Sequence, residues 1–352
     1  MHYRNLLSKV DWIYNKLEDK ESKELFDARV DYMITGDEDK FYKVIDSLSG
    51  WKCMELGKIL SETQTDKIII YGCGHDGMRT KKTIEMCGYS LYAFCDNSKK
   101  KKEIDGVPVI DLEELLKDSE RYVVVIGSRL YKQEMYASLV DNDFPRERVL
   151  IPQYGILLAN RGIQYFDVFE QVENEVFIDA GAYDGDTTET FIDWTNRNYE
   201  QIYVFEPMPV MANKIKKKFE YRKDIQIFEN AVWNKNEKLH FNENGAGSQT
   251  KENGKVSVEG KSIDSVTNGR RVTFIKMDIE GSELKALEGA KETIVKHAPR
   301  LAVCIYHKPW DVIEIAEYLL HLVPEYRFRI RHYVSNMWET VLYAEVVKEN
   351  GK

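Results

Sequence analysis

The chain has 352 residues, 43% of them hydrophobic, and a formal net charge of −9 at pH 7. This length exceeds one ordinary core and indicates two or three domains, while the hydrophobic share excludes a disordered chain. The acidic balance argues against a protein that binds nucleic-acid phosphates, so we expect no nucleic-acid partner.

The five cysteines, at positions 53, 73, 87, 95 and 304, form no Cys-x-x-Cys pair. An odd number with scattered spacing is typical of reduced thiols and predicts a cytoplasmic protein without a cysteine zinc site. The first residues, Met1–Leu7, lead directly into charged helical sequence, so we expect no signal peptide. No apolar run approaches the ~18 residues of a membrane span.

Residues 1–64 are predicted to form a helical N-terminal segment. Apolar residues recur at helical spacing over 6–17 and 25–34, and a third helix over 41–48 follows the Gly36-Asp37 turn. Such a segment packs on a neighbouring domain or on a second copy of the chain, and a homodimer through these helices is one expectation. A substrate-gating role is the alternative.

Residues 65–152 alternate predicted strands and helices. A strand over 67–71 leads into a Gly-x-Gly-x-x-Gly turn, and the strand over 90–95 ends at an acid. Such glycines let backbone approach a phosphate, and the acid stands where it would bind a ribose. We therefore predict a small Rossmann-like domain, with either no ligand or a second nucleotide or sugar-nucleotide site. The residues of that second site would be Gly72, Gly74, Gly77 and Asp96.

Residues 153–165 are predicted to be a linker, and residues 166–350 a second α/β domain. Seven strands are expected, and the short turn at 335–337 joins the last two as a hairpin. The prediction is a doubly wound, mostly parallel sheet of seven strands with a terminal antiparallel hairpin. The expected strands are 176–179, 202–206, 225–230, 273–278, 301–306, 327–333 and 340–347.

A glycine-rich turn follows the first of these strands, over Asp179–Thr187. Glycine lets the backbone pass close to a ligand, and the N–H groups of the following helix start can receive a carboxylate. Polar residues also end the next strands, and in an open parallel sheet such ends converge on one crevice. Asp179, Glu206, Asn230 and Asp278 occupy the four ends.

This series predicts a site for S-adenosylmethionine. Glu206 would accept hydrogen bonds from both ribose hydroxyls. Gly181 and Asp184 would shape the methionine end, Asp179 or Asp186 would meet the ammonium, and Asn230 would frame the adenine. The predicted cofactor-binding residues are Asp179, Gly181, Tyr183, Asp184, Gly185, Asp186, Thr187, Glu206, Pro207, Asn230, Ala231, Ser248 and Asp278.

Several ordered segments of the C-terminal half resemble the FkbM family of S-adenosylmethionine-dependent methyltransferases. They are residues 177–187, 204–207, 275–283, 287–290 and 305–311, followed by 331–333 and 339–344. The resemblance covers about half of the chain. It implies O-methylation, commonly of a sugar or polyketide hydroxyl, and the N-terminal α/β domain resembles modules fused to sugar-modifying enzymes. We therefore expect a sugar or glycan hydroxyl as the acceptor.

Methyl transfer to an alcohol requires a placed hydroxyl and a group that takes its proton. The predicted catalytic residues are His307, Asp278 and Glu280, and His307 suits general base work because it titrates near neutral pH. The alternative for His307 is a hydrogen bond to Asp311 at a helix entry, while His332 within a strand is a weaker candidate base. Asp278, Glu280 and His307 could also bind a divalent metal, but we favour a reaction without one.

Three other functions remain open. The chain could be a non-catalytic nucleotide or sugar-nucleotide binding protein, or an NAD-dependent oxidoreductase built on residues 66–150, although no hydride-transfer residue is evident there. A nucleic-acid or protein methyltransferase is disfavoured by the acidic balance.

Overall fold

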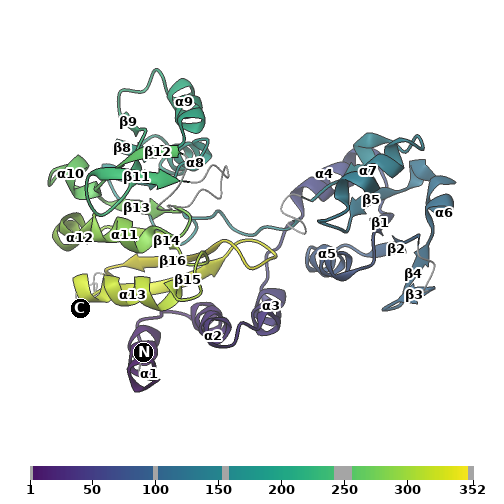
Figure 1. Ribbon diagram of the computed structural model, residues 1–352, viewed down its shortest axis with the longest axis horizontal. Coiled ribbons are helices and arrows are strands. Elements are labelled where there is room, and N and C mark those ends of the chain that lie inside the picture. The colour runs from purple at the N-terminus through teal and green to yellow at the C-terminus, as the bar shows by residue number, and fades with distance from the viewer. Residues whose placement is uncertain (1–2, 98–101, 153–157, 242–255, 348–352) are drawn as a thin grey trace. The chain divides into compact units, whose positions relative to one another are not determined.

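The computed structural model describes residues 3–97, 102–152, 158–241 and 256–347. The chain forms two compact units (Figure 1). Unit 1 comprises Met1–Phe41, Ile163–His332 and Trp338–Lys352, and unit 2 comprises Tyr42–Gly162 and Tyr333–Met337. The helices of residues 1–41 thus belong to the unit that contains the C-terminal domain, whereas the sequence analysis expected one helical segment over 1–64.

Unit 1 contains the predicted seven-stranded sheet, in the order β15-β16-β14-β13-β7-β8-β9. Strand β16 runs antiparallel to β14 and β15, and the other described pairs are parallel. The α/β fold with its terminal hairpin is therefore confirmed. The strands are β7 (Glu175–Ala180), β8 (Tyr199–Phe205), β9 (Ile225–Phe228), β13 (Phe274–Met277), β14 (Arg300–Cys304), β15 (Arg327–His332) and β16 (Thr340–Glu345).

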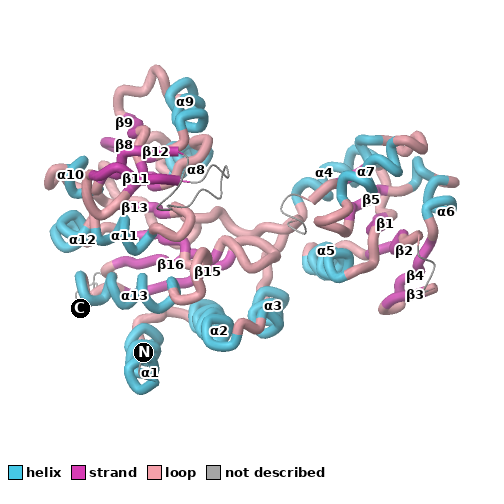
Figure 2. The backbone as a smooth tube through the Cα atoms, viewed as in Figure 1, coloured by secondary structure: helices cyan, strands magenta, loops and turns pink. Residues whose placement is uncertain are grey.

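Helices surround this sheet, and a smaller sheet lies beside it (Figure 2). The helices are α1 (Tyr3–Tyr14), α2 (Lys20–Thr35), α3 (Glu38–Ser47, which continues into unit 2), α8 (Asp186–Trp194), α9 (Pro209–Lys218), α10 (Ile263–Thr267), α11 (Glu283–Glu288), α12 (Lys291–His297) and α13 (Asp311–Leu322). The small sheet has the order β10-β12-β11, from β10 (Ala231–Val232), β11 (Glu237–Phe241) and β12 (Val256–Lys261). The predicted site residue Ser248 lies between β11 and β12, outside the described residues.

The central strands are mostly apolar because both faces of the sheet are covered. Every residue of β7 and β13 is buried, the pattern of parallel strands covered on both sides rather than of a half-exposed sheet. An aromatic cluster fills the core beneath β7, where the rings of Phe177 and Phe191 stack with centroids 4.1 Å apart. Phe166 and Phe274 pack on the same cluster.

The N-terminal segment covers the edge of the sheet. Residues on both sides of Leu17 pair with β15: Phe328 donates its N–H to the Lys16 carbonyl at 2.9 Å, and Glu18 donates to the Phe328 carbonyl at 3.0 Å. Helix α1 contacts α13, and α2 contacts β15. Edge strands are prone to unwanted pairing, and this cover prevents it. The apolar faces of these helices are used within the unit, and the homodimer stays an untested prediction.

Unit 2 contains a six-stranded sheet in the order β3-β4-β2-β1-β5-β6, parallel except for the β3–β4 pair. This confirms the predicted Rossmann-like module. Its elements are α4 (Met54–Thr63), β1 (Ile68–Tyr71), α5 (His75–Met86), β2 (Leu91–Cys95), β3 (Glu103–Ile104), β4 (Val107–Ile110), α6 (Leu112–Leu116), β5 (Val123–Ile126), α7 (Lys132–Val140) and β6 (Val149–Leu150).

A disulfide joins Cys53 and Cys87 in unit 2, so the prediction of reduced thiols is wrong for these two residues. Cys53 directly precedes α4 and Cys87 directly follows α5, and their Cα atoms lie 5.8 Å apart, within the usual range for a disulfide. The pairing was invisible in the sequence because 34 positions separate the two residues. Among the described residues, no helix has both the length and the apolar character to cross a membrane.

Candidate active site

The glycine turn lies against the neighbouring strand ends. Gly181, directly after β7, has φ +81°, and a Cβ added there would stand 1.9 Å from the carbonyl oxygen of Asp278. Only glycine fits this close approach. Gly181 and Ala182 both donate N–H groups to the carbonyl of Phe205, at 3.0 and 3.1 Å. The turn is therefore fixed between the carboxyl ends of β8 and β13.

Glu206 follows β8 and holds the other side of the turn. Its side chain is 5% exposed, and its Oε2 and Oε1 accept the N–H groups of Tyr183 at 2.9 Å and Met208 at 2.8 Å. Burial raises the pKa of Glu206, and the two N–H groups and Lys276 offset only part of that rise. A carboxylate has about four acceptor positions, so the two that remain can accept hydroxyl groups.

Asp179 is an internal support rather than an exposed ligand. It is fully buried in β7, where Lys276 Nζ lies 3.1 Å from its Oδ1 and Thr188 Oγ1 donates to its Oδ2 at 2.7 Å. Lys276 also donates to the carbonyl of Gly181 at 2.6 Å. Burial lowers the pKa of Lys276, but Asp179 and Asp278 more than offset it and hold that pKa above its usual value. The buried pair thus fastens β13 to the start of the turn.

The other predicted cofactor residues lie around these groups. Gly185 (φ +86°) directly precedes α8 as its N-cap, and Asp184 accepts the N–H of Asp186 at 3.3 Å. Asp186 itself is exposed and lies 2.6 Å from Lys218. Asn230 donates to the carbonyl of Glu259 at 3.0 Å, linking the end of β9 to the small sheet. Four more complete the set: Tyr183, 45% exposed, Thr187 in α8, Pro207 after Glu206, and buried Ala231 in β10.

Asp278 is the centre of an acidic cluster at the end of β13. It accepts hydrogen bonds from the hydroxyls of Tyr165 at 3.0 Å and Tyr306 at 3.3 Å. Tyr306 also donates to Glu339 at 3.3 Å, and Gln164 donates to the other oxygen of Glu339 at 2.5 Å. Burial and the nearby Asp278 raise the pKa of Glu339 to about 7. Tyr165 thus belongs to the site, although the sequence analysis placed it in a linker.

His307 lies beside Asp278, as predicted from its position after the fifth strand. Its side chain is 6% exposed, and its Nε2 lies 3.5 Å from both Asp278 Oδ1 and Glu280 Oε2. Burial tends to lower the pKa of His307. Glu283 and the other nearby carboxylates outweigh this effect and raise the pKa to about 9. Burial raises the pKa of Glu280 to about 7. The structure therefore brings the three predicted catalytic residues together.

Glu283, the first residue of α11, is a member of this cluster that the sequence analysis missed. Its Oε1 lies 3.0 Å from His307 Nδ1 and accepts the N–H groups of Ile279 at 3.0 Å and Gly281 at 3.3 Å. These bonds hold the loop that carries Glu280, whose φ is +57°. Glu283 is the last residue of segment 275–283, which resembles the FkbM family. A glutamate in the first turn of a helix is common, however, so the sequence gives no reason to assign it to the site.

Asp311 and His332 both have structural partners away from the acidic cluster. Asp311 accepts the N–H of Lys308 at 2.9 Å, so it caps the helix entry through the backbone, while His307 contacts Glu283. His332 is fully buried in β15, and its Nδ1 lies 2.8 Å from Thr340 Oγ1 in the paired strand. His332 therefore supports the hairpin.

In unit 2, the predicted second nucleotide residues gather at the carboxyl ends of β1 and β2. Gly72 has φ +103°, and a Cβ on Gly77 would lie 2.0 Å from the Gly72 carbonyl oxygen. Gly74 directly precedes α5, and Asp96 accepts a hydrogen bond from the Cys73 thiol at 2.9 Å. Gly72 and Gly77 are therefore required for close packing of α5 on the turn whether or not a ligand binds, whereas an added Cβ at Gly74 would meet no atom within 4 Å.

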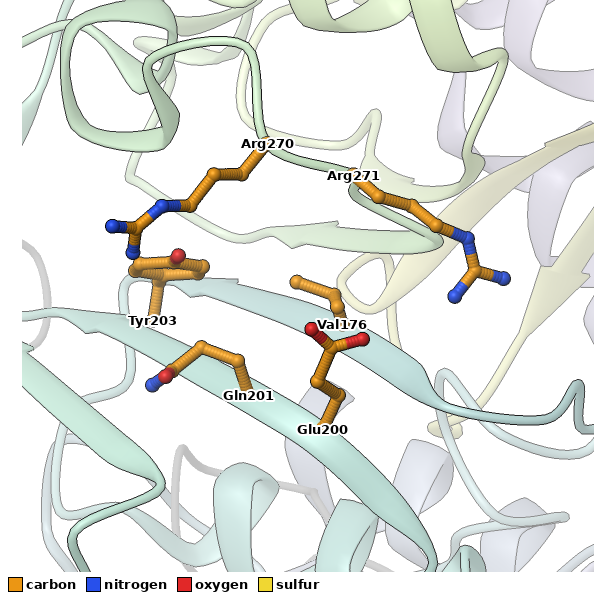
Figure 3. A pocket seen from close by; sticks show the side chains of 6 residues that line it. All are labelled: Val176, Glu200, Gln201, Tyr203, Arg270 and Arg271. Carbon is orange, nitrogen blue, oxygen red and sulfur yellow. The ribbon is translucent and has the colours of Figure 1, made fainter.

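A pocket of about 370 Å³ lies at the other end of the main sheet (Figure 3). It is lined by Val176 of β7, by Glu200, Gln201 and Tyr203 of β8, and by Arg270 and Arg271 of the loop before β13. Val176, Glu200 and Gln201 lie in the amino-terminal parts of their strands. Ligands of open α/β sheets bind at the carboxyl ends, so this pocket is separate from the site around Glu206.

Comparison with known proteins agrees with this geometry. Residues 179–330 match the methyltransferase FkbM domain, and residues 67–139 match the PglD N-terminal domain. The resemblance inferred from the sequence is therefore confirmed for the C-terminal half. No curated protein matches the chain.

Solved structures give weaker similarities. A methyltransferase FkbM from Methylobacillus flagellatus KT has 17% identity and a TM-score of 0.48, with 91% of this chain and 98% of that chain covered. An rRNA methylase from Streptococcus thermophilus has 12% identity and a TM-score of 0.33, with coverage of 50% and 89%. A putative methyltransferase from Streptococcus mutans in complex with SAH has 11% identity and a TM-score of 0.33, with coverage of 50% and 90%.

Proposed function

We propose that this chain, whose residues 179–330 carry a methyltransferase FkbM domain, transfers the methyl group of S-adenosylmethionine to a hydroxyl of a sugar, glycan or glycosylated metabolite. The observation that carries the proposal is the placement of Glu206. Its buried carboxylate is fixed by the glycine turn and keeps free acceptor positions at the carboxyl edge of the sheet.

The cofactor would lie along this edge. Glu206 would accept the two ribose hydroxyls, and the turn from Gly181 to Gly185 would enclose the methionine part. Asn230 and Ala231 would border the adenine. Asp179 would act through Lys276, which holds the Gly181 carbonyl, rather than through direct contact with the methionine ammonium.

The acceptor would lie at the acidic cluster beside the turn. Asp278, Glu280 and His307 would bind the acceptor hydroxyl, and Glu280, with a pKa of about 7 against about 9 for His307, would take its proton while the oxygen attacks the methyl carbon. The carbon–sulfur bond then breaks, and S-adenosylhomocysteine leaves with the bonding electron pair on sulfur. The protein contributes the alignment of the oxygen with that bond and the removal of the proton.

The direct test is incubation of the full chain with S-adenosylmethionine and a panel of sugars and glycans, with detection of a product heavier by one methyl group. We expect turnover with at least one sugar and a large loss of turnover in His307→Ala, with cofactor binding retained. Wild-type turnover in His307→Ala would remove this residue from catalysis. If no sugar is methylated but a protein or nucleic acid is, the acceptor class is wrong.

Unit 2 supports a second, separate proposal. Gly72, Gly74, Gly77 and Asp96 gather at the carboxyl ends of adjacent parallel strands, where nucleotides bind in folds of this type. We propose a nucleotide or sugar-nucleotide ligand there, and saturation-transfer NMR with a nucleotide panel tests it. An NAD-dependent dehydrogenase would instead require NAD binding and hydride transfer by this unit.

A further inference from the structure

We propose that Asp278, Glu283 and His307 form a binding site for one divalent metal ion of the Mn²⁺ type. Its role in placing the acceptor oxygen rests on the proposed function, but binding of the ion itself does not. The sequence alone favours a reaction without a metal, and the candidate ligands that it offers are Asp278, Glu280 and His307, without Glu283.

The three residues come from different elements and converge on one point. Asp278 follows β13, Glu283 begins α11, and His307 lies in the loop between β14 and α13. One ligand atom from each lies within 4.8 Å of the others. An imidazole binds a cation through one nitrogen, and Nε2 of His307 lies 3.5 Å from Asp278 Oδ1, a separation of the size expected between two ligands of one small cation.

The second observation is a set of buried polar atoms without hydrogen bonds. Within the described part of the chain, Oε2 of Glu283 and Nε2 of His307 have no hydrogen-bond partner, whereas Nδ1 of His307 faces Glu283 Oε1 at 3.0 Å. The two side chains are only 1% and 6% exposed. A buried polar atom without a hydrogen bond commonly lowers the stability of the fold by about 1–3 kcal/mol. A cation between Glu283 and His307 would satisfy these two atoms.

The nearby positive side chains are engaged by other groups. Lys276 pairs with Asp179 and the Gly181 carbonyl, and Lys308 donates to the carbonyl of Gly281. Three carboxylates, those of Asp278, Glu280 and Glu283, therefore lie around a single imidazole. Buried charge of one sign is expensive unless it is paired, and a divalent ion would balance it.

A second group of candidate ligands, Asp278, Cys304 and Glu339, is also close enough to hold an ion. Cys304 and Glu339, which distinguish this group from the first, already have partners. The Tyr165 hydroxyl lies 3.5 Å from the Cys304 sulfur, and Gln164 and Tyr306 both donate to Glu339. The polar atoms without partners lie around His307, so we assign the ion to the first group.

The ligand set defines the chemistry of the ion. Two carboxylates and one imidazole suit Mn²⁺ better than Ca²⁺, which prefers oxygen ligands alone. Three protein ligands leave coordination positions for oxygen atoms of the acceptor, as in other metal sites that orient a substrate. The exposed face of the site, where the Glu280 side chain is 32% exposed, is where such an acceptor would enter.

The test uses the full chain, freed of metal with EDTA and then dialysed. Mn²⁺ is added, and the free ion is measured by electron paramagnetic resonance, without cofactor or acceptor. We expect one Mn²⁺ per chain, with affinity weakened roughly tenfold or more in His307→Ala and in Glu283→Gln. Glu292→Gln, which changes an exposed carboxylate of α12, should bind Mn²⁺ like the wild type.

Binding of S-adenosylhomocysteine is measured on the same samples. It shows that each variant is folded, and His307→Ala carries the test if Glu283→Gln fails to fold, because Glu283 also holds two backbone N–H groups. No Mn²⁺ binding by the wild type, or equal binding by His307→Ala, would overturn the metal site. Mn²⁺ binding without S-adenosylhomocysteine binding would support the metal site and contradict the proposed cofactor.

Discussion

Lys276 Nζ lies 3.1 Å from Asp179 Oδ1, and both side chains are almost completely buried in adjacent parallel strands. The pair joins two strand ends of the candidate site, because Lys276 also donates to the carbonyl of Gly181 in the glycine turn. Removal of one partner from such a pair leaves a buried charge without compensation.

Lys276→Met is therefore expected to destabilise unit 1 by about 3–5 kcal/mol. Chemical denaturation followed by circular dichroism measures this loss. The double variant Asp179→Asn/Lys276→Met should lose less than the sum of the two single variants, since neither charge then remains. Additive losses would show that the two side chains do not interact.

Gly181→Ala should abolish the correct turn and with it cofactor binding. The added Cβ would meet a backbone oxygen at 1.9 Å, and the residue has φ +81°. Gly36→Ala is the matched control, because Gly36 also has positive φ (+69°) but no atom within 4 Å of the added Cβ. We expect the control to lose about 1 kcal/mol of stability through backbone strain and to keep cofactor affinity. Normal S-adenosylhomocysteine binding by Gly181→Ala would contradict the described turn.

Asp19 links helix α2 to strand β15. It accepts the N–H of Ser22 at 2.8 Å and a hydrogen bond from Arg331 at 2.7 Å. Burial tends to raise the pKa of Asp19, but Arg331 and Ser22 outweigh it and lower that pKa to about 2.

Because the folded-state pKa is depressed, the ionised carboxylate stabilises the fold above the ordinary pKa of about 4. That stabilisation decreases as the pH falls from about 4 towards 2. Asp19→Asn keeps the N-cap oxygen but removes the charge facing Arg331, so it should cost up to about 1 kcal/mol at neutral pH, and the gap in stability to the wild type should narrow below pH 4. Thermal melts across this pH range measure the gap, and a gap independent of pH would show that the carboxylate charge has no such role.

The sequence predicted much of the fold because its strands and turns carry strong local signals. The apolar runs before Gly72 and Gly181 and the short turn at 335–337 placed the parallel strands and the terminal hairpin. The convergence of Asp278, Glu280 and His307 followed from the rule that carboxyl ends of parallel strands share one edge.

The remaining features depend on contacts between distant residues. Cys53 and Cys87 pair only because two helix ends meet, and Tyr165 enters the site from a segment without periodicity. Glu283 could be recognised as a site residue only once the loop after β14 was seen to place His307 beside it. Asp179 appeared to be a ligand because no sequence pattern shows that Lys276 occupies its carboxylate.

The central claim is that Glu206 anchors S-adenosylmethionine, and calorimetric titration of S-adenosylhomocysteine into the full chain tests it most directly. We predict binding by the wild type and by Glu220→Gln, which changes an exposed carboxylate. Glu206→Ala should bind more weakly by about 1–3 kcal/mol, through loss of charge-assisted hydrogen bonds. Equal affinity of Glu206→Ala and the wild type, or no binding by the wild type, would contradict the account.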